Sequence, residues 1–166
     1  MSPLFREKNF HDEPKEIFFL LRDFNKFKKK ELNENYQKMK KFIIDSKNSS
    51  VYLSPSYPFG RKNRFQNIPQ LSEAIFWLYS SFKNKIEIKI IHLDRSIQES
   101  TLSAYGRGYS KNIKQACHHL YKSALVLDEH IISLKKKFKI LKLDYHNFVK
   151  NPKPYCLKLS KYLNFK

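Results

Sequence analysis

Apolar side chains recur at the 3.6-residue spacing of an amphipathic helix in several stretches of this chain. In the first stretch, over residues 16–44, Leu32, Tyr36, Met39 and Ile43 share one helix face. The same spacing predicts further helices over residues 67–82, 96–105 and 110–134, and a last one after Pro152.

Short apolar runs and apolar–polar alternation predict β-strands elsewhere. Residues 86–93 alternate and then become continuously apolar, which is the strongest strand pattern in the chain and is typical of a central strand. Residues 138–143 predict another strand, residues 51–53 a short buried one, and residues 17–21 either a strand or part of the first helix. Because long helices separate these strands, we expect crossover connections and an α/β fold, a parallel sheet flanked by helices.

Length and charge narrow the classes of protein to consider. The 166 residues suffice for one domain, and 41% of them are hydrophobic, which argues against disorder. Lys and Arg number 33 against 15 Asp and Glu, a net charge of +18 that favours an anionic partner. Only six of the basic residues are Arg, the better residue for specific phosphate recognition, so a lysine surplus on solvated faces is the alternative.

The apolar runs and the charged residues near the start predict a cytoplasmic protein, and the two cysteines do not make a disulfide framework or a metal set. Cys117 lies on the apolar stripe of the helix that Ser110 is expected to cap, so we expect a buried thiol, and Cys156 is expected to face inward in the last helix. No run approaches the roughly 18 apolar residues of a membrane span. Residues 5–8 are Phe-Arg-Glu-Lys, which is charged where a signal peptide would be apolar.

The carboxyl end of the strand at 86–93 carries the most informative candidate site, because ligands of open parallel sheets bind beyond this end of the strands. Arg95 follows the strand, Ser96 can open a helix, and Ser103 lies eight residues beyond Arg95. Helix-start amides, a guanidinium and a hydroxyl would together suit a phosphate dianion. The alternative is that Arg95 pairs with a surface carboxylate and Ser103 is an ordinary hydroxyl on a helix face.

The segment Ile-Ile-His-Leu-Asp-Arg at residues 90–95, followed by Ser103, resembles the 3′-phosphate-binding segment of the sulfotransferases that use 3′-phosphoadenosine 5′-phosphosulfate (PAPS). In that family a strand ends in Arg and a Ser follows at this spacing. The resemblance implies that Arg95 and Ser103 bind the 3′-phosphate of the donor nucleotide. It also implies a P-loop-NTPase-like fold and the transfer of a sulfonate group to an acceptor hydroxyl without a metal.

Further segments match the family in order along the chain. Residues 143–152, Leu-Asp-Tyr-His-Asn-Phe-Val-Lys-Asn-Pro, resemble its late Tyr-Glu-Asp-Leu and Asp-Pro segment, although His146 and Asn147 replace the acidic pair. Residues 54–57, Ser-Pro-Ser-Tyr, resemble the Ser-Pro-x-Tyr loop of the heparan- and carbohydrate-type branch, although Tyr and Leu at 52–53 replace the usual Glu-Lys pair. The branch implies an acceptor hydroxyl on a glycan.

The remaining candidate residues lie near the start of the chain and in a basic loop. Residues 6–12, Arg-Glu-Lys-Asn-Phe-His-Asp, are similar to the family's Lys-Glu-x-His-Phe-Phe-Asp segment, so the resemblance implies that Glu7 is the catalytic base toward the acceptor. Lys62 is a candidate anion contact, or a solvated loop residue. The adjacent histidines at 118–119 and His130 lack the i, i+4 spacing of a helical zinc site, so no metal site is expected.

The resemblance also implies that part of the family's fold would precede this chain. The family's first strand and its Ser-Gly-Thr loop, which binds the 5′-phosphosulfate, should come before Glu7. We therefore expect a single sulfotransferase-like domain over residues 1–166 that lacks this strand and loop, so that the protein is incomplete or inactive unless they are supplied. In the family's sheet the missing strand lies between the strands at 86–93 and 138–143, and the run at 17–21 is a candidate to fill the gap.

Two other classes of function remain open. The first is a non-catalytic basic module that binds nucleic acid or another polyanion. Against it, Phe76, Trp77 and Tyr79 lie together on one amphipathic helix, not on an exposed strand where bases could stack. The second is a degenerate copy that keeps the fold and has no activity.

Overall fold

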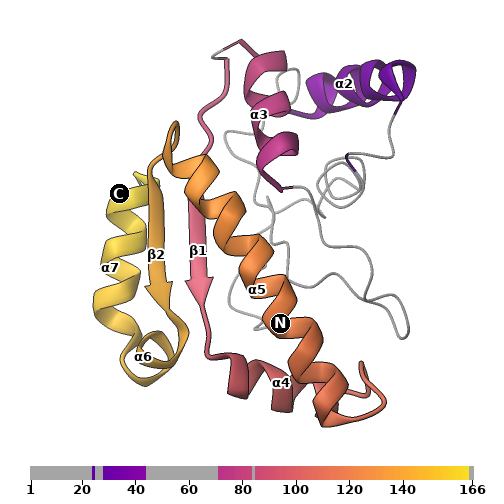
Figure 1. Ribbon diagram of the computed structural model, residues 1–166. Helices are drawn as coiled ribbons and strands as arrows, with labels where there is room; N and C mark the ends of the chain where they lie inside the picture. Colours follow the sequence, from indigo (N-terminus) through magenta and orange to yellow (C-terminus); the bar gives the residue numbers. More distant parts are fainter. Residues whose placement is uncertain (1–23, 25–27, 44–70, 84, 165–166) are drawn as a thin grey trace. The chain divides into compact units, whose positions relative to one another are not determined.

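The computed structural model describes residues 24, 28–43, 71–83 and 85–164. The chain divides into two compact units (Figure 1). One comprises Met1–Phe59 and Phe65–Ile86, and the other comprises Gly60–Arg64 and Glu87–Lys166.

The first unit contributes two amphipathic helices. Helix α2 spans Lys29–Ile43 and helix α3 spans Leu71–Ser81, which confirms helices within both predicted stretches. Helix α3 and the turn after it bury a row of side chains at helical spacing: Leu71, Ala74, Leu78 and Phe82. The ring of Tyr36 from α2 lies 5.2 Å from that of Phe82, centroid to centroid, so an aromatic contact joins the two helices.

The second unit is a parallel β–α–α–β arrangement. Strand β1 (Ile90–Asp94) leads into α4 (Ile97–Gly106) and α5 (Ile113–Lys135), and strand β2 (Ile140–Asp144) returns beside β1. The two strands pair in parallel, from Ile90 opposite Ile140 to Asp94 opposite Asp144. The predicted α/β class and the helical crossover are therefore confirmed, within a described part that is mostly helical.

The direct pairing of β1 with β2 corrects one expectation. The sulfotransferase resemblance implied a family strand between these two, and hence a gap to be filled. The strands are hydrogen-bonded neighbours, so no such gap exists. The described residues form a two-stranded sheet, and the expected strands at 17–21 and 51–53 lie outside them.

Two short helices follow β2. Helix α6 (Tyr145–Lys150) begins directly at the strand end, where the Asp144 carboxylate accepts a hydrogen bond from the Asn147 amide at 2.7 Å. Helix α7 (Pro152–Leu163) has Pro in its first turn and lies beside β2 (Figure 1). The sequence predicted α7 but no helix over residues 145–150.

Helix α5 begins later than predicted. Its cap is Asn112, whose side chain accepts a hydrogen bond from the Gln115 amide at 2.8 Å, and not Ser110. Gly108 adopts a φ of +69°, a left-handed conformation that ends the turn after α4 and that glycine reaches at low cost. Ser110 is instead a buried residue of this connection.

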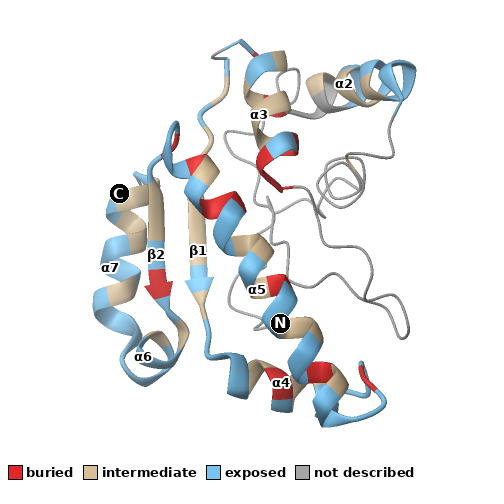
Figure 2. Cartoon of the chain, in the orientation of Figure 1, coloured by how far each residue is buried: buried red, intermediate tan, exposed pale blue. Residues whose placement is uncertain are grey.

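Few of the described side chains of the second unit are buried (Figure 2). Ala116, Ile131 and Leu134 of α5, with Phe138 and Leu143, are buried. The expected buried thiol is wrong, because Cys117 is exposed, and Cys156 of α7 is exposed too. Each helix residue turns by about 100°, so burying Ala116 carries the next side chain away from the buried face of α5.

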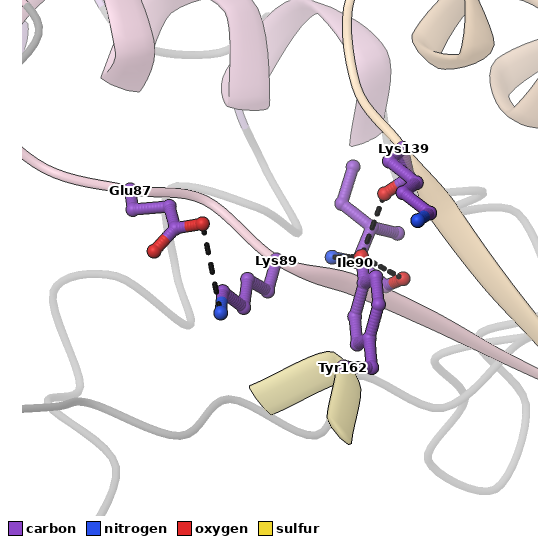
Figure 3. A network of polar contacts seen from close by, with 5 residues as sticks. All are labelled: Glu87, Lys89, Ile90, Lys139 and Tyr162. Atoms are coloured by element: carbon purple, nitrogen blue, oxygen red, sulfur yellow. Dashed lines mark hydrogen bonds and ion pairs between the residues drawn. The ribbon is translucent and has the colours of Figure 1, made fainter. Parts of the chain in front are cut away.

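A single hydroxyl joins α7 to the starts of both strands (Figure 3). The Tyr162 hydroxyl accepts a hydrogen bond from the Ile90 amide at 3.0 Å. It donates to the Lys139 carbonyl at 2.6 Å, or to the Ile90 carbonyl at 3.0 Å. These bonds fix the carboxyl-terminal end of α7 against the amino-terminal end of the sheet.

Candidate functional site

The carboxyl edge, the end of the sheet where both strands finish, holds the candidate residues of the second unit. Asp94 and Asp144 end the two strands in register. Each is followed at once by a helix start, through Arg95 and Ser96 to α4 and through Tyr145 to α6. Segments about 50 residues apart in the chain thus meet at one edge, as parallel pairing requires.

Arg95 lies between these two helix starts. Its guanidinium carbon is 4.8 Å from the centroid of the Tyr145 ring, which is cation–π geometry. Its Nε is 3.5 Å from Oε2 of Glu99, one helical turn later, and the two side chains are 35% and 40% exposed. The alternative predicted for Arg95, an ion pair with a surface carboxylate, is therefore present in the structure.

Glu99 contacts a second basic group. Its Oε1 lies 3.5 Å from Nδ1 of His146, and this contact becomes an ion pair when the imidazole is protonated. The Glu99 amide also donates to the Ser96 hydroxyl at 3.2 Å, which caps α4. One carboxylate therefore lies beside both cations at the start of α4.

The aspartates at the strand ends are already engaged. Asp94 Oδ2 lies 2.7 Å from Nζ of Lys142 across the sheet. The hydrogen bond to Asp94 raises the pKa of Lys142 above its ordinary value. Burial lowers the pKa of His92, on the same strand, and the nearby Asp94 carboxylate opposes that shift. The carboxyl edge is thus largely neutralised by its own side chains.

Ser103 lies on the same side of α4 as Glu99, four residues further on, or about 6 Å along the helix axis. It is half-buried, and its carbonyl accepts a hydrogen bond from the Arg107 amide at 3.1 Å. Arg95 contacts the carboxylate of Glu99, which lies on this side of the helix. The two residues of the predicted phosphate seat therefore face one side of the helix.

Other predicted residues lie outside the described part of the chain. These are Glu7, Lys62 and the loop at residues 54–57. Within residues 28–43, 71–83 and 85–164, no group of three or more His, Cys, Asp or Glu is arranged to hold a metal ion. Over the same described residues, each helix is too short or too polar to cross a bilayer.

Sequence reasoning missed Tyr145 and Glu99 as neighbours of Arg95. The spacing Arg95-x-x-x-Glu99 is an i, i+4 charge pair, a signal that was present in the sequence. Tyr145 could be placed only once the register of the two strands was known, because 50 residues separate it from Arg95.

Comparisons with protein-family models, with curated proteins and with solved structures found no match to this chain. Its function must therefore be argued from the residues and geometry given above. What the structure itself establishes is an α/β unit with a parallel strand pair and a mixed-charge edge.

Proposed function

We propose that the protein is a PAPS-dependent sulfotransferase, in which Arg95 and Ser103 bind the 3′-phosphate of the donor nucleotide at the carboxyl edge. The reaction would pass a sulfonate group to a hydroxyl, such as one on a glycan. The family motif at residues 90–95 and Ser103 suggests this activity. The edge geometry supports the binding step, and transfer itself would need groups outside the described residues.

One observation carries the proposal: Arg95 stands at the carboxyl end of a parallel strand, directly before a helix, on the side of that helix where Ser103 lies. This is where nucleotide phosphates bind in open α/β sheets. The ring of Tyr145 supports the guanidinium from the end of the second strand. A cation held from both strands suits a dianion better than a freely moving side chain does.

The chemistry follows from the nature of sulfonate transfer. The acceptor oxygen forms a bond to sulfur while the bond from sulfur to the bridging phosphate oxygen breaks, leaving adenosine 3′,5′-bisphosphate. The acceptor proton goes to a base, for which the proposal names Glu7. Catalysis depends mainly on positioning and on stabilising charge, as in phosphoryl transfer.

Thermal unfolding with adenosine 3′,5′-bisphosphate tests the binding step. At about 100 times its Kd, the nucleotide should raise the Tm by roughly 5–10 °C, since binding then adds about 2.7 kcal/mol. Arg95→Ala should lose this shift. Arg107→Ala removes the same charge from the exposed far end of α4 and should keep it. Absence of a shift in the unmodified protein, or equal loss in both variants, would contradict the proposal.

A further inference from the structure

The two ends of the parallel sheet carry very different charge. At the carboxyl edge, the carboxylates of Asp94, Glu99 and Asp144 face Arg95 and Lys142, so opposite charges nearly balance. The opposite end, where both strands begin, is built from the segment before β1, the turn from α5 into β2, and the end of α7. Figure 1 shows these segments gathered at one end of the unit.

We call this end the lysine edge. It is defined by five lysines: Lys89, Lys135, Lys136, Lys139 and Lys161. The Tyr162 hydroxyl fixes it, because its bonds to Ile90 and Lys139 hold the three segments together (Figure 3). The lysines therefore belong to one rigid surface and not to independent loops.

Little of this charge is neutralised. Glu87 pairs with Lys89, Oε1 to Nζ, at 3.6 Å. The other four lysines are exposed, and among the described residues none of them forms an ion pair with a carboxylate. Lys135 and Lys136 also stand at the carboxyl-terminal end of α5, where they offset the helix dipole. Lys161 stands in the last turn of α7 in the same way, so helix dipoles account for three of these lysines and leave Lys139 without such a role.

The chemistry of the edge indicates which anion it fits. Lysine is a compact point charge that binds phosphate without the bidentate geometry of arginine. In the described part of the chain this edge offers no exposed ring for stacking on bases, since Phe138 is buried and the Tyr162 hydroxyl is engaged. The phosphate backbone of a nucleic acid fits such a surface, because lysines can bind its repeated charges without bidentate geometry and without stacking on the bases. Duplex DNA provides one phosphate charge per about 1.7 Å of its axis, so a lysine surface gains much from releasing its counterions.

We propose that the lysine edge is a sequence-independent binding surface for the phosphate backbone of a nucleic acid duplex. This surface is separate from the carboxyl edge, so it does not depend on the nucleotide site of Arg95. An extended polyanion can bind to these lysines without displacing carboxylates of the protein from their ion pairs.

Fluorescence anisotropy with a labelled 20-base-pair duplex of arbitrary sequence tests this proposal in the full chain. The variant Lys135→Gln/Lys136→Gln/Lys139→Gln removes three charges from the edge. The control Lys111→Gln/Lys114→Gln/Lys122→Gln removes three exposed charges from the connection before α5 and from its first half. The net charge is the same in both, so a general field effect cancels between them. The Tm of each variant shows that it remains folded.

We expect the edge variant to bind the duplex at least about ten-fold more weakly at 50 mM NaCl and to lower the slope of log K against log salt by roughly 2–3, about 0.9 per lost phosphate contact. The control should change affinity by less than about two-fold. Equal loss in both variants would show that only net charge matters, and overturn the proposal. So would the absence of duplex binding, or binding of heparin with no binding of DNA, which would assign the edge to an anionic glycan.

Discussion

At the residue scale, the Glu99 carboxylate is a negative charge beside Arg95, the residue proposed to bind an anion. Its carboxylate lies 3.5 Å from Nε of Arg95, so an incoming phosphate must approach a guanidinium that already has a negative neighbour. Both side chains are about a third or more exposed, so solvent screens the pair and the attraction between them is weak. If Arg95 binds the donor phosphate as proposed, Glu99 should weaken that binding without blocking it.

Replacing this carboxylate should strengthen binding of the nucleotide. In Glu99→Gln the repulsion between the carboxylate and the phosphate is removed, and we expect adenosine 3′,5′-bisphosphate to bind about two- to five-fold more tightly, as measured by calorimetry. Glu129→Gln makes the same change in charge at an exposed position of α5 and should leave the affinity unchanged. Weaker binding in Glu99→Gln would mean that Glu99 holds Arg95 in place more than it competes with the ligand.

At the element scale, Tyr162 is the side chain on which the junction of α7 with the sheet depends. Its hydroxyl bonds to both strand starts, and α7 has no fully buried side chain. Tyr162→Phe keeps the ring and removes the hydroxyl, leaving the Ile90 amide and the Lys139 carbonyl without this partner. We expect a loss of about 1–2 kcal/mol in the free energy of unfolding.

Urea unfolding measures this loss as a lower midpoint with an unchanged m-value. Tyr155→Phe is the matched control, because Tyr155 lies on the same helix and its ring contact with Phe148, at 5.9 Å between centroids, survives the change. The control should stay within about 0.5 kcal/mol of the unmodified protein. Similar losses in both variants would show that the Tyr162 hydroxyl has no special role.

Periodicity predicted the elements well and their contacts poorly. The strand patterns at 86–93 and 138–143 overlap β1 and β2, which begin later than predicted, at Ile90 and Ile140, because apolar runs are typical of paired strands. Helix α6 was missed because six residues are too few for a helical period, although Asp144 capping the Asn147 amide is a local signal. The neighbour of β1 was misjudged, since strand order is a long-range property that spacing along the chain does not encode.

For the candidate site too, the place of a residue in its element was predictable, whereas its long-range contacts were not. Position along the chain predicted that Arg95 would stand at a strand end, and the structure agrees. The Glu99 carboxylate beside the guanidinium follows from a local i, i+4 spacing, whereas the Tyr145 ring depends on the pairing of β1 with β2, which begins 45 residues after Arg95. The prediction of a buried Cys117 thiol was wrong for a related reason. An apolar stripe shows which face of a helix is buried only to within about one residue.

At the scale of the whole molecule, the charge is both large and uneven. The net +18 implies self-repulsion in the compact state. Residues 87–164 alone contain 15 Lys and Arg against six Asp and Glu, and much of the excess lies at the lysine edge. The ion pairs of the carboxyl edge are mostly exposed and add little stability in return.

This balance predicts how stability responds to salt. Raising NaCl from about 20 mM to 500 mM shortens the Debye length from roughly 20 Å to 4 Å, which screens repulsion among distant lysines more than attraction within a pair such as Lys142 and Asp94 at 2.7 Å. The Tm should therefore rise with salt. The triple lysine-edge variant, which carries less repulsion, should start from a higher Tm at low salt and gain less. A Tm that falls with salt would mean that attraction within the ion pairs outweighs repulsion among the lysines. It would also mean that the lysines of the lysine edge repel one another less than their shared position implies.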